Sequence, residues 1–432
     1  MSLEYRLLQA LSAWRGAPRW SVALSGGLDS LVLLHALSRL REQHALPPLR
    51  ALHVAHGLQT VAEDWPAHCQ TCCEAWQVPL EVLAVQVLRE ASLEQAARQA
   101  RYAALGAQLQ DGELLLLAQH ADDQVETVLQ RLLRGTGVRG LAGMPSARPL
   151  AAGWLFRPLL NESRATLAAY AEQHALRWVD DPSNLDLRFT RNRLRHQVLP
   201  ALREHWPGVD ASLRRCAEQA AEAQGLLDEL AVTDLAAAQQ PAAWDWLGLP
   251  QLALAPLRAL SQARQRNALR HWLAPRTLLP DAAHWAGWEA LRDAGEDRQP
   301  VWRLHAGELR RSAGRLFWLS GDWCVTPVEP PAWTRQTSLA LPGNGVLHVQ
   351  GVLPAGQVSV HYRRGGELLC LPGRGQRDLK RLFNERDVPA FLRQRWPLLA
   401  IDGQLRAVAG LAGLDGRQCG DWQVQWQPPP SS

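Results

Sequence analysis

One short stretch constrains the fold of this chain most strongly: Ser25-Gly26-Gly27-Leu28-Asp29-Ser30. An apolar run precedes it at 20–24 and another follows it at 31–37, an order that fits a strand, a turn and a helix. Two adjacent glycines allow a positive φ and let the backbone approach a ligand closely. Free N–H groups at a helix start attract phosphate, and serine hydroxyls stand beside them. The stretch therefore predicts a phosphate-binding loop, for which a tight turn capped by Asp29 and Ser30 is the alternative.

The loop fits neither of two common nucleotide-binding patterns. No lysine follows its second glycine, as a Walker A loop requires, and it does not have the dinucleotide pattern G-x-G-x-x-G. It resembles instead the pyrophosphatase loop, Ser-Gly-Gly-x-Asp-Ser, of enzymes that split ATP between the α and β phosphates. This resemblance implies that the segment from Ser25 to Ser30 binds ATP.

Strand-like and helix-like segments alternate after the loop. The candidate strands are 49–55, 79–85 and 113–118, and the candidate helices are 30–43, 61–76, 92–110 and 123–134. An amphipathic helix over 1–15 precedes the loop. The alternation predicts an α/β fold with a parallel sheet covered on both faces, whose ligands bind beyond the carboxyl ends of the strands.

A histidine pair, His53 and His56, stands where the second candidate strand ends. Their spacing could suggest a metal site. We prefer the interpretation that one neutral histidine packs under a nucleotide and the other caps a turn, which assigns His53 to the ATP site.

Acidic residues gather after the last long strand, in the run His120-Ala121-Asp122-Asp123-Gln124-Val125-Glu126. If a helix begins near Asp122, Asp123 and Glu126 share one of its faces. Carboxylates there could hold Mg²⁺, which prefers oxygen ligands and phosphates, or an ammonium group. First-turn acids that complement the helix dipole are the alternative.

Basic residues concentrate in three further segments. Arg98 and Arg101 lie three apart in a candidate helix and could reach phosphates. Residues 188–195 carry four arginines, and residues 361–397 form another basic concentration. Such segments suit phosphates and unstacked bases, whereas solvated charged helices are the alternative. Because the net charge is only +4, the placement of these residues matters more than their number.

The length of 432 residues is enough for about three domains of ordinary size. We expect an α/β domain at 1–205, a helical middle domain at 206–300 and a smaller α+β domain at 301–432. In the last of these, Gly/Pro turns separate short apolar runs, which favours strands.

Composition also narrows the class of protein. No apolar run reaches the roughly 20 residues of a membrane span and the N-terminus lacks a signal-peptide pattern, so we expect a cytoplasmic protein. Seven cysteines argue against a disulfide framework in so large a chain. Cys69, Cys72 and Cys73 could hold a metal or an iron–sulfur centre, but no second pair lies nearby, and we expect buried, idle thiols.

Together these motifs resemble the tRNA(Ile)-lysidine synthetase family, whose catalytic domain has the PP-loop fold of adenine nucleotide alpha hydrolases. The resemblance is continuous over about 20–205 and resumes more loosely at 360–400, where the family has a tRNA-binding domain. Besides the glycine loop, it is carried by His53-Val54-x-His56-Gly57-Leu58, Ala97 to Tyr102, Leu117 to Thr127, the glycine run ending at Met144, Arg157-Pro158-Leu159, Asp181-Pro182-Ser183-Asn184 and Arg191-Asn192-Arg193-Leu194-Arg195.

The resemblance implies a reaction on tRNA(Ile) with a CAU anticodon. ATP adenylates O2 of the wobble cytidine, and free L-lysine attacks C2 to give lysidine while AMP leaves, so that the anticodon reads AUA. Mg²⁺ would lie near Asp29 or Asp123. Asp123 with Glu126 would hold the lysine amine or the metal, and His120 would accept a proton. The implied contacts to phosphates and tRNA are Arg98, Arg191, Arg193, Arg195, Arg364, Lys380 and Arg381.

Two positions depart from the family pattern: Ala55 stands where Asn or Asp is usual, and Gln59 where Arg is common. A rival interpretation is a PP-loop tRNA thiolation enzyme, for which the cysteines at 69–73 are the only support. Another rival interpretation is a non-catalytic RNA-binding protein with a decayed ATP loop. The presence of Asp29 and Asp123 argues against it. The sequence leaves open whether the protein forms a homodimer.

Overall fold

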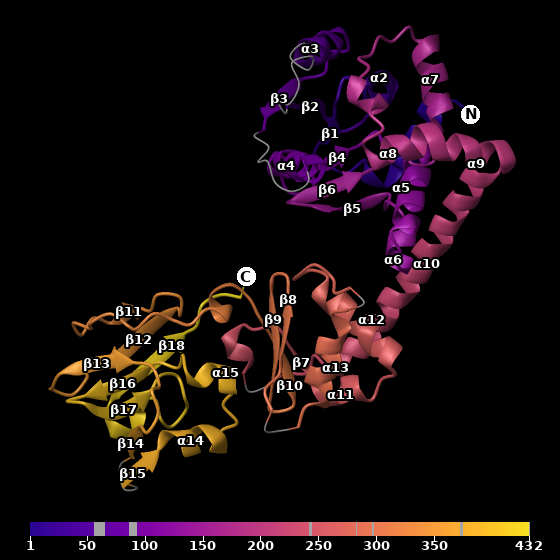
Figure 1. The fold of residues 1–432 in the computed structure, drawn as a ribbon. Helices are drawn as coiled ribbons and strands as arrows, with labels where there is room; N and C mark the ends of the chain where they lie inside the picture. The colour runs from indigo at the N-terminus through magenta and orange to yellow at the C-terminus, as the bar shows by residue number, and fades with distance from the viewer. Residues whose placement is uncertain are drawn as a thin grey trace. The chain divides into compact units, whose positions relative to one another are not determined.

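The protein is described by a computed structural model over residues 1–55, 65–85, 93–241, 244–281, 283–295, 298–371 and 375–431. It divides into two compact units, Met1–Gly225 and Leu226–Ser432 (Figure 1). No helix in the described part of the chain is long and apolar enough to cross a lipid bilayer.

A six-stranded sheet forms the centre of the first unit. Its strands, in spatial order, are β3 (Leu80–Ala84), β2 (Leu49–Ala55), β1 (Trp20–Ala23), β4 (Leu114–Leu116), β6 (Gly153–Phe156) and β5 (Ala147–Leu150). All but β5 run parallel, and β5 pairs antiparallel with β6 at one edge. The predicted parallel α/β sheet is thus confirmed. The strand order reverses beside β1, which is where sheets of this kind bind ligands.

The helices of the first unit are α1 (Leu3–Ala10), α2 (Leu28–Gln43), α3 (Trp65–Ala75), α4 (Leu93–Ala107), α5 (Ala121–Leu133), α6 (Val138–Leu141), α7 (Arg164–Gln173), α8 (Thr190–Arg193), α9 (Leu199–His205) and α10 (Val209–Ala236). Leu114 and Leu116 of β4 pack among buried residues of α1, α2 and α7, whereas Leu115 packs with Leu105 of α4. Strand β4 is therefore apolar without alternation because both of its faces are buried.

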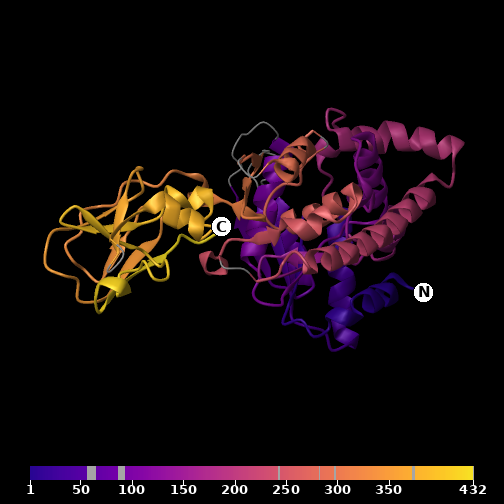
Figure 2. The same cartoon turned by 90° about the horizontal axis from the view of Figure 1, so that it is seen from below.

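The observed boundaries differ slightly from those predicted. Helix α2 begins at Leu28 rather than at 30, and α4 ends at Ala107 rather than at 110. The predicted start of α3 at 61 and the side chain of His56 lie outside the described residues. Helix α10 is one continuous helix that begins in the first unit and ends in the second (Figures 1 and 2).

The glycine-rich segment after α5 folds back onto that helix. The Gln124 side chain donates to the Met144 carbonyl at 3.1 Å and accepts the Met144 N–H at 2.7 Å. Arg131 donates to the carbonyls of Gly140 and Gly143 at 3.1 and 2.6 Å. These bonds fix α5, the helix that carries the acidic cluster.

The second unit begins with helices packed on a four-stranded antiparallel sheet. Its elements are β7 (Gln251–Ala253), α11 (Leu254–Arg258), α12 (Gln262–Leu273), α13 (Trp285–Asp293), β8 (Val301–Leu304), β9 (Gly307–Ser312) and β10 (Arg315–Leu319). The helices and strands share one core, in which Trp272, Trp288 and Trp318 are buried. The strands that follow residue 300 thus complete a core to which the preceding helices also contribute.

The remainder of the second unit is mostly strands, as predicted for an α+β region. They are β11 (Ser338–Ala340), β12 (Val346–Gly351), β13 (Val358–His361), β14 (Leu368–Leu371), β15 (Gly375–Asp378), β16 (Leu398–Ile401), β17 (Gln404–Val408) and β18 (Trp422–Gln427), with helices α14 (Leu379–Glu385) and α15 (Ala390–Arg393). They form a three-stranded sheet, β11-β12-β18, and a five-stranded sheet, β13-β16-β17-β14-β15. Phe383, Trp396 and Trp426 belong to the core beneath them.

Candidate active site

The glycine loop connects β1 to α2, as its sequence predicts. Gly26 has a φ of +82°, and a Cβ at this position would lie 3.2 Å from Sγ of Cys69, so both its conformation and its surroundings favour glycine. Gly27 is the N-cap of α2 and no side chain caps the helix. The first N–H groups of a long helix are therefore left for a ligand.

The two serines of the loop hold each other. The Ser25 N–H donates to Oγ of Ser30 at 3.1 Å, and the two hydroxyl oxygens are also 3.1 Å apart. Ser30 in turn donates to the Gly27 carbonyl at 3.0 Å. Asp29 does not cap the turn: its Oδ1 is buried without a hydrogen-bond partner among the described residues. The arrangement is that of an ordered loop beside a carboxylate with one oxygen that accepts no hydrogen bond from the described residues.

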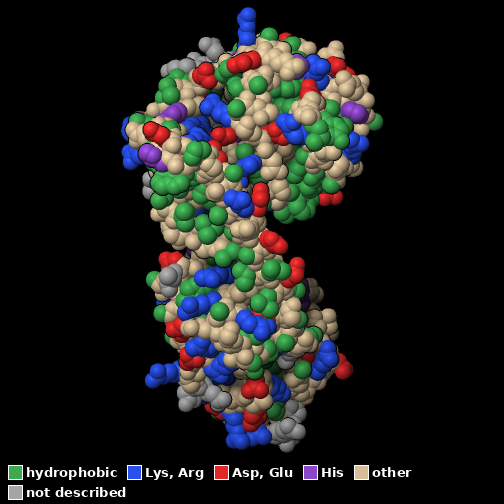
Figure 3. Space-filling model, turned by 90° about the vertical axis from the view of Figure 1, so that its right-hand side faces the viewer, with side chains coloured by type: hydrophobic (Ala, Val, Ile, Leu, Met, Phe, Trp, Pro, Cys, Tyr) green, Lys and Arg blue, Asp and Glu red, His purple; other side chains and the backbone are tan. Residues whose placement is uncertain are grey.

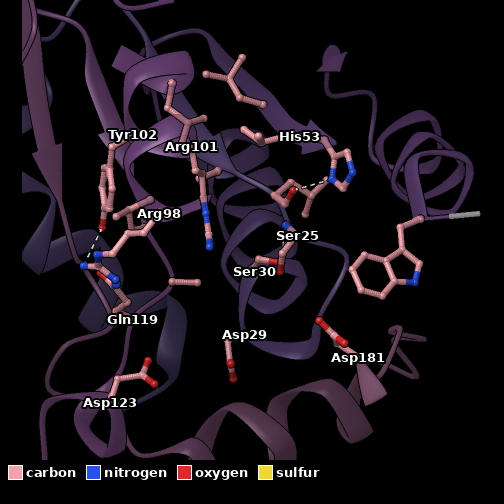
Figure 4. Close-up of a pocket in the computed structure, with 18 residues that line it drawn as sticks. Ser25, Asp29, Ser30, His53, Arg98, Arg101, Tyr102, Gln119, Asp123 and Asp181 are labelled. Atoms are coloured by element: carbon pink, nitrogen blue, oxygen red, sulfur yellow. Dashed lines mark hydrogen bonds between the residues drawn. The ribbon is translucent and has the colours of Figure 1, made fainter. Parts of the chain in front are cut away.

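A cavity of about 350 Å³ opens beside the loop, where β1, β2 and β4 end (Figure 4). Its lining residues are Ala23, Leu24, Ser25, Asp29, Ser30, Leu52, His53, Val54, Trp65, Arg98, Arg101, Tyr102, Leu105, Leu117, Ala118, Gln119, Asp123 and Asp181. Figure 4 shows Arg101 of α4 pointing into the cavity, with Asp29 and Asp123 at one end of it. An apolar wall and a polar end suit a nucleoside with phosphates.

His53 is buried in the wall of this cavity. Its Nδ1 donates to the Leu24 carbonyl at 2.9 Å, which fixes the ring against β1. Burial lowers the pKa of His53, while the bond to Leu24 acts in the opposite direction. The neutral state predicted for this residue is therefore the state that its surroundings favour.

His120, the N-cap of α5, is buried among three aspartates. Its Nε2 lies 3.6 Å from Oδ2 of Asp29 and 3.6 Å from Oδ2 of Asp123. Its Nδ1 lies 3.6 Å from Oδ2 of Asp122. The backbone N–H of His120 also donates to Asp123 at 3.1 Å. The loop and the acidic cluster, which are about 90 residues apart in the sequence, therefore meet at this imidazole.

The charges around His120 favour its protonated form. Burial opposes protonation, but close polar contacts with Asp122 and Asp29 and the charge of Asp123 outweigh it and raise the pKa of His120 to about 10. The imidazole is then a cation that lies 3.6 Å from each of the three carboxylates. Its predicted role as proton acceptor requires that it first lose this proton.

Two arginines of the basic segment at 188–195 bind the acidic face of α5. Arg191 contacts Asp123 (Nη2 to Oδ1) and Glu126 (Nε to Oε2), both at 2.6 Å. Arg195 contacts the same two acids, Glu126 at 2.6 Å and Asp123 at 3.3 Å. Helix α8 and the π-turn that follows it, Leu194–Val198, place the two arginines on one face. These arginines are therefore part of the site.

The other predicted contacts lie apart from this cluster. Arg193 is exposed and donates to the Leu187 carbonyl at 3.2 Å, although it belongs to the same segment. Arg98 contacts Tyr102 in the first cavity, with its guanidinium 5.1 Å from the ring centroid. Arg364, Lys380 and Arg381 lie on the surface of the second unit, all of them exposed.

A second cavity, of about 380 Å³, adjoins the first. Its lining residues are Ser25, Gly27, Leu28, Asp29, Trp65, Arg101, Asp123, Arg164, Val179, Asp180, Asp181, Asn184, Arg191, Asn192 and Arg195. Asp29 and Asp123 line both cavities, so they stand where the contents of the two would meet. This cavity is rich in both carboxylates and guanidinium groups, which suits a zwitterionic or phosphate-bearing ligand.

Sequence reasoning missed several residues of the site. The sequence indicates that Arg101 could reach phosphates and places Asp181 in a loop motif of the family resemblance, but it assigns neither residue to the site. The Val179 N–H donates to the Gly26 carbonyl at 3.0 Å, which brings the loop with Asp181 onto the glycine loop. No sequence pattern indicates a binding role for Trp65, because a single aromatic residue near a helix start is common. The site thus includes residues that only tertiary contacts bring in.

The residues present fit a magnesium ion that shares its ligands with a nucleotide. The described residues include no group of three or more His, Cys, Asp or Glu side chains that could hold a metal alone. Mg²⁺ is usually bound through one or two carboxylates, with phosphates and waters completing the shell. Asp29, with a buried oxygen that has no described partner, is suited to this role.

The cysteine cluster has a structural place beneath the site. Cys69 and Cys73 are buried in α3, and Sγ of Cys69 lies 3.6 Å from Nδ1 of His53. Burial, with smaller effects of neighbouring thiols and, for Cys73, of Glu74, raises the pKa of each of these two thiols to about 12. Thiols in this state are poor nucleophiles. The expectation of buried, idle thiols agrees with the environment of Cys69 and Cys73, whereas Cys216 and Cys324 are exposed, so burial is not general. A persulfide-forming cysteine does not fit the surroundings of Cys69 and Cys73.

Comparison with known proteins covers nearly the whole chain. Residues 1–202 match the PP-loop domain, residues 252–317 the TilS substrate binding domain and residues 358–426 the TilS substrate C-terminal domain. A tRNA(Ile)-lysidine synthase of Pseudomonas aeruginosa is 58% identical over 431 residues, which are 99% of this chain and 97% of that protein.

More distant relatives carry the same name. A tRNA(Ile)-lysidine synthase of Pseudomonas fluorescens is 55% identical over 429 residues, 99% of this chain and 97% of that protein. One of Escherichia coli is 40% identical over 404 residues, 90% of this chain and 91% of that protein.

Proposed function

The chain belongs to the tRNA(Ile)-lysidine synthases, ATP-dependent ligases that form lysidine on tRNA(Ile), and from this premise we propose how its site divides the reaction. The first cavity binds ATP and the second cavity receives lysine, while the wobble cytidine of the CAU anticodon enters where they meet. The observation that carries this proposal is the pair Asp29 and Asp123, which line both cavities and face one imidazole.

The proposed reaction has two steps. O2 of the cytidine attacks the α-phosphorus of ATP, pyrophosphate leaves, and the base is adenylated. The amine of free L-lysine, once deprotonated, attacks C2 of the activated base, and AMP leaves with the former O2. The modified anticodon then reads AUA instead of AUG.

The glycine loop and α4 would hold the nucleotide. The free N–H groups at the start of α2 face the phosphates, where they stabilise the charge that develops on the departing pyrophosphate. Arg101 points toward the same region (Figure 4), and Arg98 lies one turn away in α4. The apolar wall with His53 accommodates the base and ribose.

Asp29 and Asp123 would hold Mg²⁺ together with the phosphates. When bound there, the ion would neutralise phosphate charge and orient the α-phosphorus for attack. His120 holds both carboxylates from beneath, and its burial keeps water from that side.

Glu126 takes a different role from the one its spacing suggested. It is 2% exposed and contacts both Arg191 and Arg195, so we assign it to holding those arginines. Asp181, which lines the second cavity, is then left for the lysine ammonium group. The two arginines would bind the lysine carboxylate or an RNA phosphate.

The exposed basic residues would bind the body of the tRNA. Arg193 in the first unit and Arg364, Lys380 and Arg381 in the second are solvent-exposed, as phosphate contacts must be. Figure 3 shows basic side chains spread over the drawn face of the second unit, among fewer acidic ones. We propose that residues 1–205 carry the chemistry and that 301–432 contribute tRNA contacts.

The test is transfer of label. The full-length protein is incubated with ATP, Mg²⁺, radiolabelled lysine and CAU-anticodon tRNA(Ile), and AMP and tRNA-bound label are measured. Equal amounts of AMP and bound label are expected. AMP without bound label would exclude the lysine step and keep the ATP chemistry, and pyrophosphate without AMP or label would place the block after adenylation.

A further inference from the structure

Asp122 contacts the site without lining either cavity. Its Oδ2 lies 3.6 Å from Nδ1 of His120, the ring nitrogen that does not face the shared carboxylates. The same oxygen accepts the backbone N–H of Arg164 at 2.9 Å, at the start of α7. Asp122 therefore holds the buried imidazole from behind and is itself tied to a second helix.

Arg203 of α9 connects Asp122 to the start of α10. Its Nη2 lies 3.4 Å from Oδ1 of Asp122, and its Nε donates to Oδ2 of Asp210 at 2.9 Å. A guanidinium group is planar and rigid, so one arginine that spans two carboxylates transmits a movement of either. Asp210 is in the first turn of α10, so the contacts run without a gap from α10 to His120.

Helix α10 is the element that leads out of the first unit. It runs from Val209 to Ala236, past the division between the units at Gly225, and the substrate binding domain match at 252–317 follows it. Helix α10 is therefore a covalent path along which a force exerted on the second unit by bound tRNA can reach the first unit. The polar chain from Asp210 to His120 begins where α10 begins.

We propose that Asp122 and Arg203 are positioning residues that couple α10 to His120, so that tRNA held by the second unit sets the orientation of the imidazole for the ATP step. The inference rests on the proposed function, since it assigns a second task to the same site. Neither residue lines the two cavities of the site, so their loss is expected to change the rate of the step and leave substrate affinity intact. A displacement of about 1 Å at a catalytic group can cost about 100-fold in rate. A small shift of His120, passed on through Asp122 and Arg203, is therefore enough to change the rate of the ATP step.

The test compares two RNA substrates, the whole tRNA(Ile) and a hairpin that contains only its CAU anticodon arm. AMP release is measured at saturating ATP, lysine and RNA. The wild-type protein is expected to turn over the whole tRNA about tenfold faster than the hairpin. In Arg203→Ala the rate of AMP release with the whole tRNA should fall to the rate measured with the hairpin. The rate with the hairpin, the KM for ATP and the Kd for tRNA should stay within about twofold of the wild-type values.

Arg215→Ala, which removes an exposed charge from α10, is the matched control and should behave as wild type. Asp210→Asn breaks the same chain with little change of volume and should give the same pattern if Arg203→Ala does not fold. Equal losses with both RNAs, or equal wild-type rates for the two, would overturn the coupling. No AMP from wild-type protein with whole tRNA would instead mean that the proposed function itself has failed.

Discussion

Two regions of the molecule use charge in opposite ways. One is the site beyond the carboxyl ends of the parallel strands in the first unit, called the sheet edge below, and the other is the basic surface of the second unit. At the sheet edge, Asp123 and Glu126 are buried and each contacts two arginines. On the second unit, Arg381 pairs with Glu385 at 3.1 Å, but the two side chains are 73% and 50% exposed. Water screens the second pair more strongly than the first, whose carboxylates are buried, so the same kind of contact has different consequences.

The difference indicates a division of labour. Buried, mutually dependent charges fix the position of a few atoms, as a reacting centre requires. Exposed charges that are weakly held can reach a mobile phosphate backbone and are individually dispensable. We therefore expect substitutions at the sheet edge to change rates or folding, and substitutions on the basic surface to change only tRNA affinity.

The largest effect is expected from Asp29→Ala. Loss of this carboxylate removes a proposed Mg²⁺ ligand and the partner of His120, and AMP release should fall about 10³-fold. Filter binding should show tRNA affinity within about twofold of wild type. Equal losses of AMP release and tRNA affinity would mean that the glycine loop is not the ATP site.

Glu126→Ala tests the energetic side of the comparison. It removes one of the two buried acids that Arg191 and Arg195 contact and leaves them Asp123, so urea unfolding of the first unit should lose about 2 kcal/mol. Glu385→Ala, the matched change at the exposed pair, should cost at most about 0.5 kcal/mol. Similar losses for the two variants would show that the buried cluster is no more cooperative than the surface pair.

A smaller effect is expected from Lys380→Ala combined with Arg381→Ala. Each residue that contacts a phosphate should contribute about one unit to the slope of log Kd against log salt, so the double variant should lose up to about two units. Because Lys380 is the only lysine of the chain, its acetylation can be followed by mass spectrometry, and bound tRNA should protect it. An unchanged slope together with unprotected Lys380 would remove this surface from the tRNA interface.

The smallest effect is expected from the triple change Cys69→Ser, Cys72→Ser and Cys73→Ser. Lysine transfer should remain within about twofold, with a modest loss of thermal stability because two buried thiols become hydroxyls. Abolished transfer by a protein that still melts cooperatively would revive a sulfur-dependent mechanism.

Local patterns were sufficient to predict the parallel sheet and two parts of the candidate site, the glycine loop at 25–30 and the acidic run at 120–126. Each of these segments contains residue types that suit phosphate or cation binding. They could not reveal that Arg191 and Arg195 hold Glu126, since 65 residues separate the nearest partners and only the fold brings them together. The spacing of Asp123 and Glu126 was equally consistent with a metal site. Trp65 enters the site through tertiary packing alone, and Asp181, although it stands in a motif of the family resemblance, is brought to the site by the contact of its loop with the glycine loop.

One comparison tests the division of labour most directly. AMP release is measured at saturating ATP, lysine and tRNA for Asp29→Ala and for the combined Lys380→Ala and Arg381→Ala variant. If the sheet edge performs the chemistry and the basic surface only binds, saturating tRNA restores the second variant to within about twofold of wild type and leaves the first about 10³-fold slower. Restoration of Asp29→Ala by tRNA, or a persistent loss in the surface variant, would contradict this account.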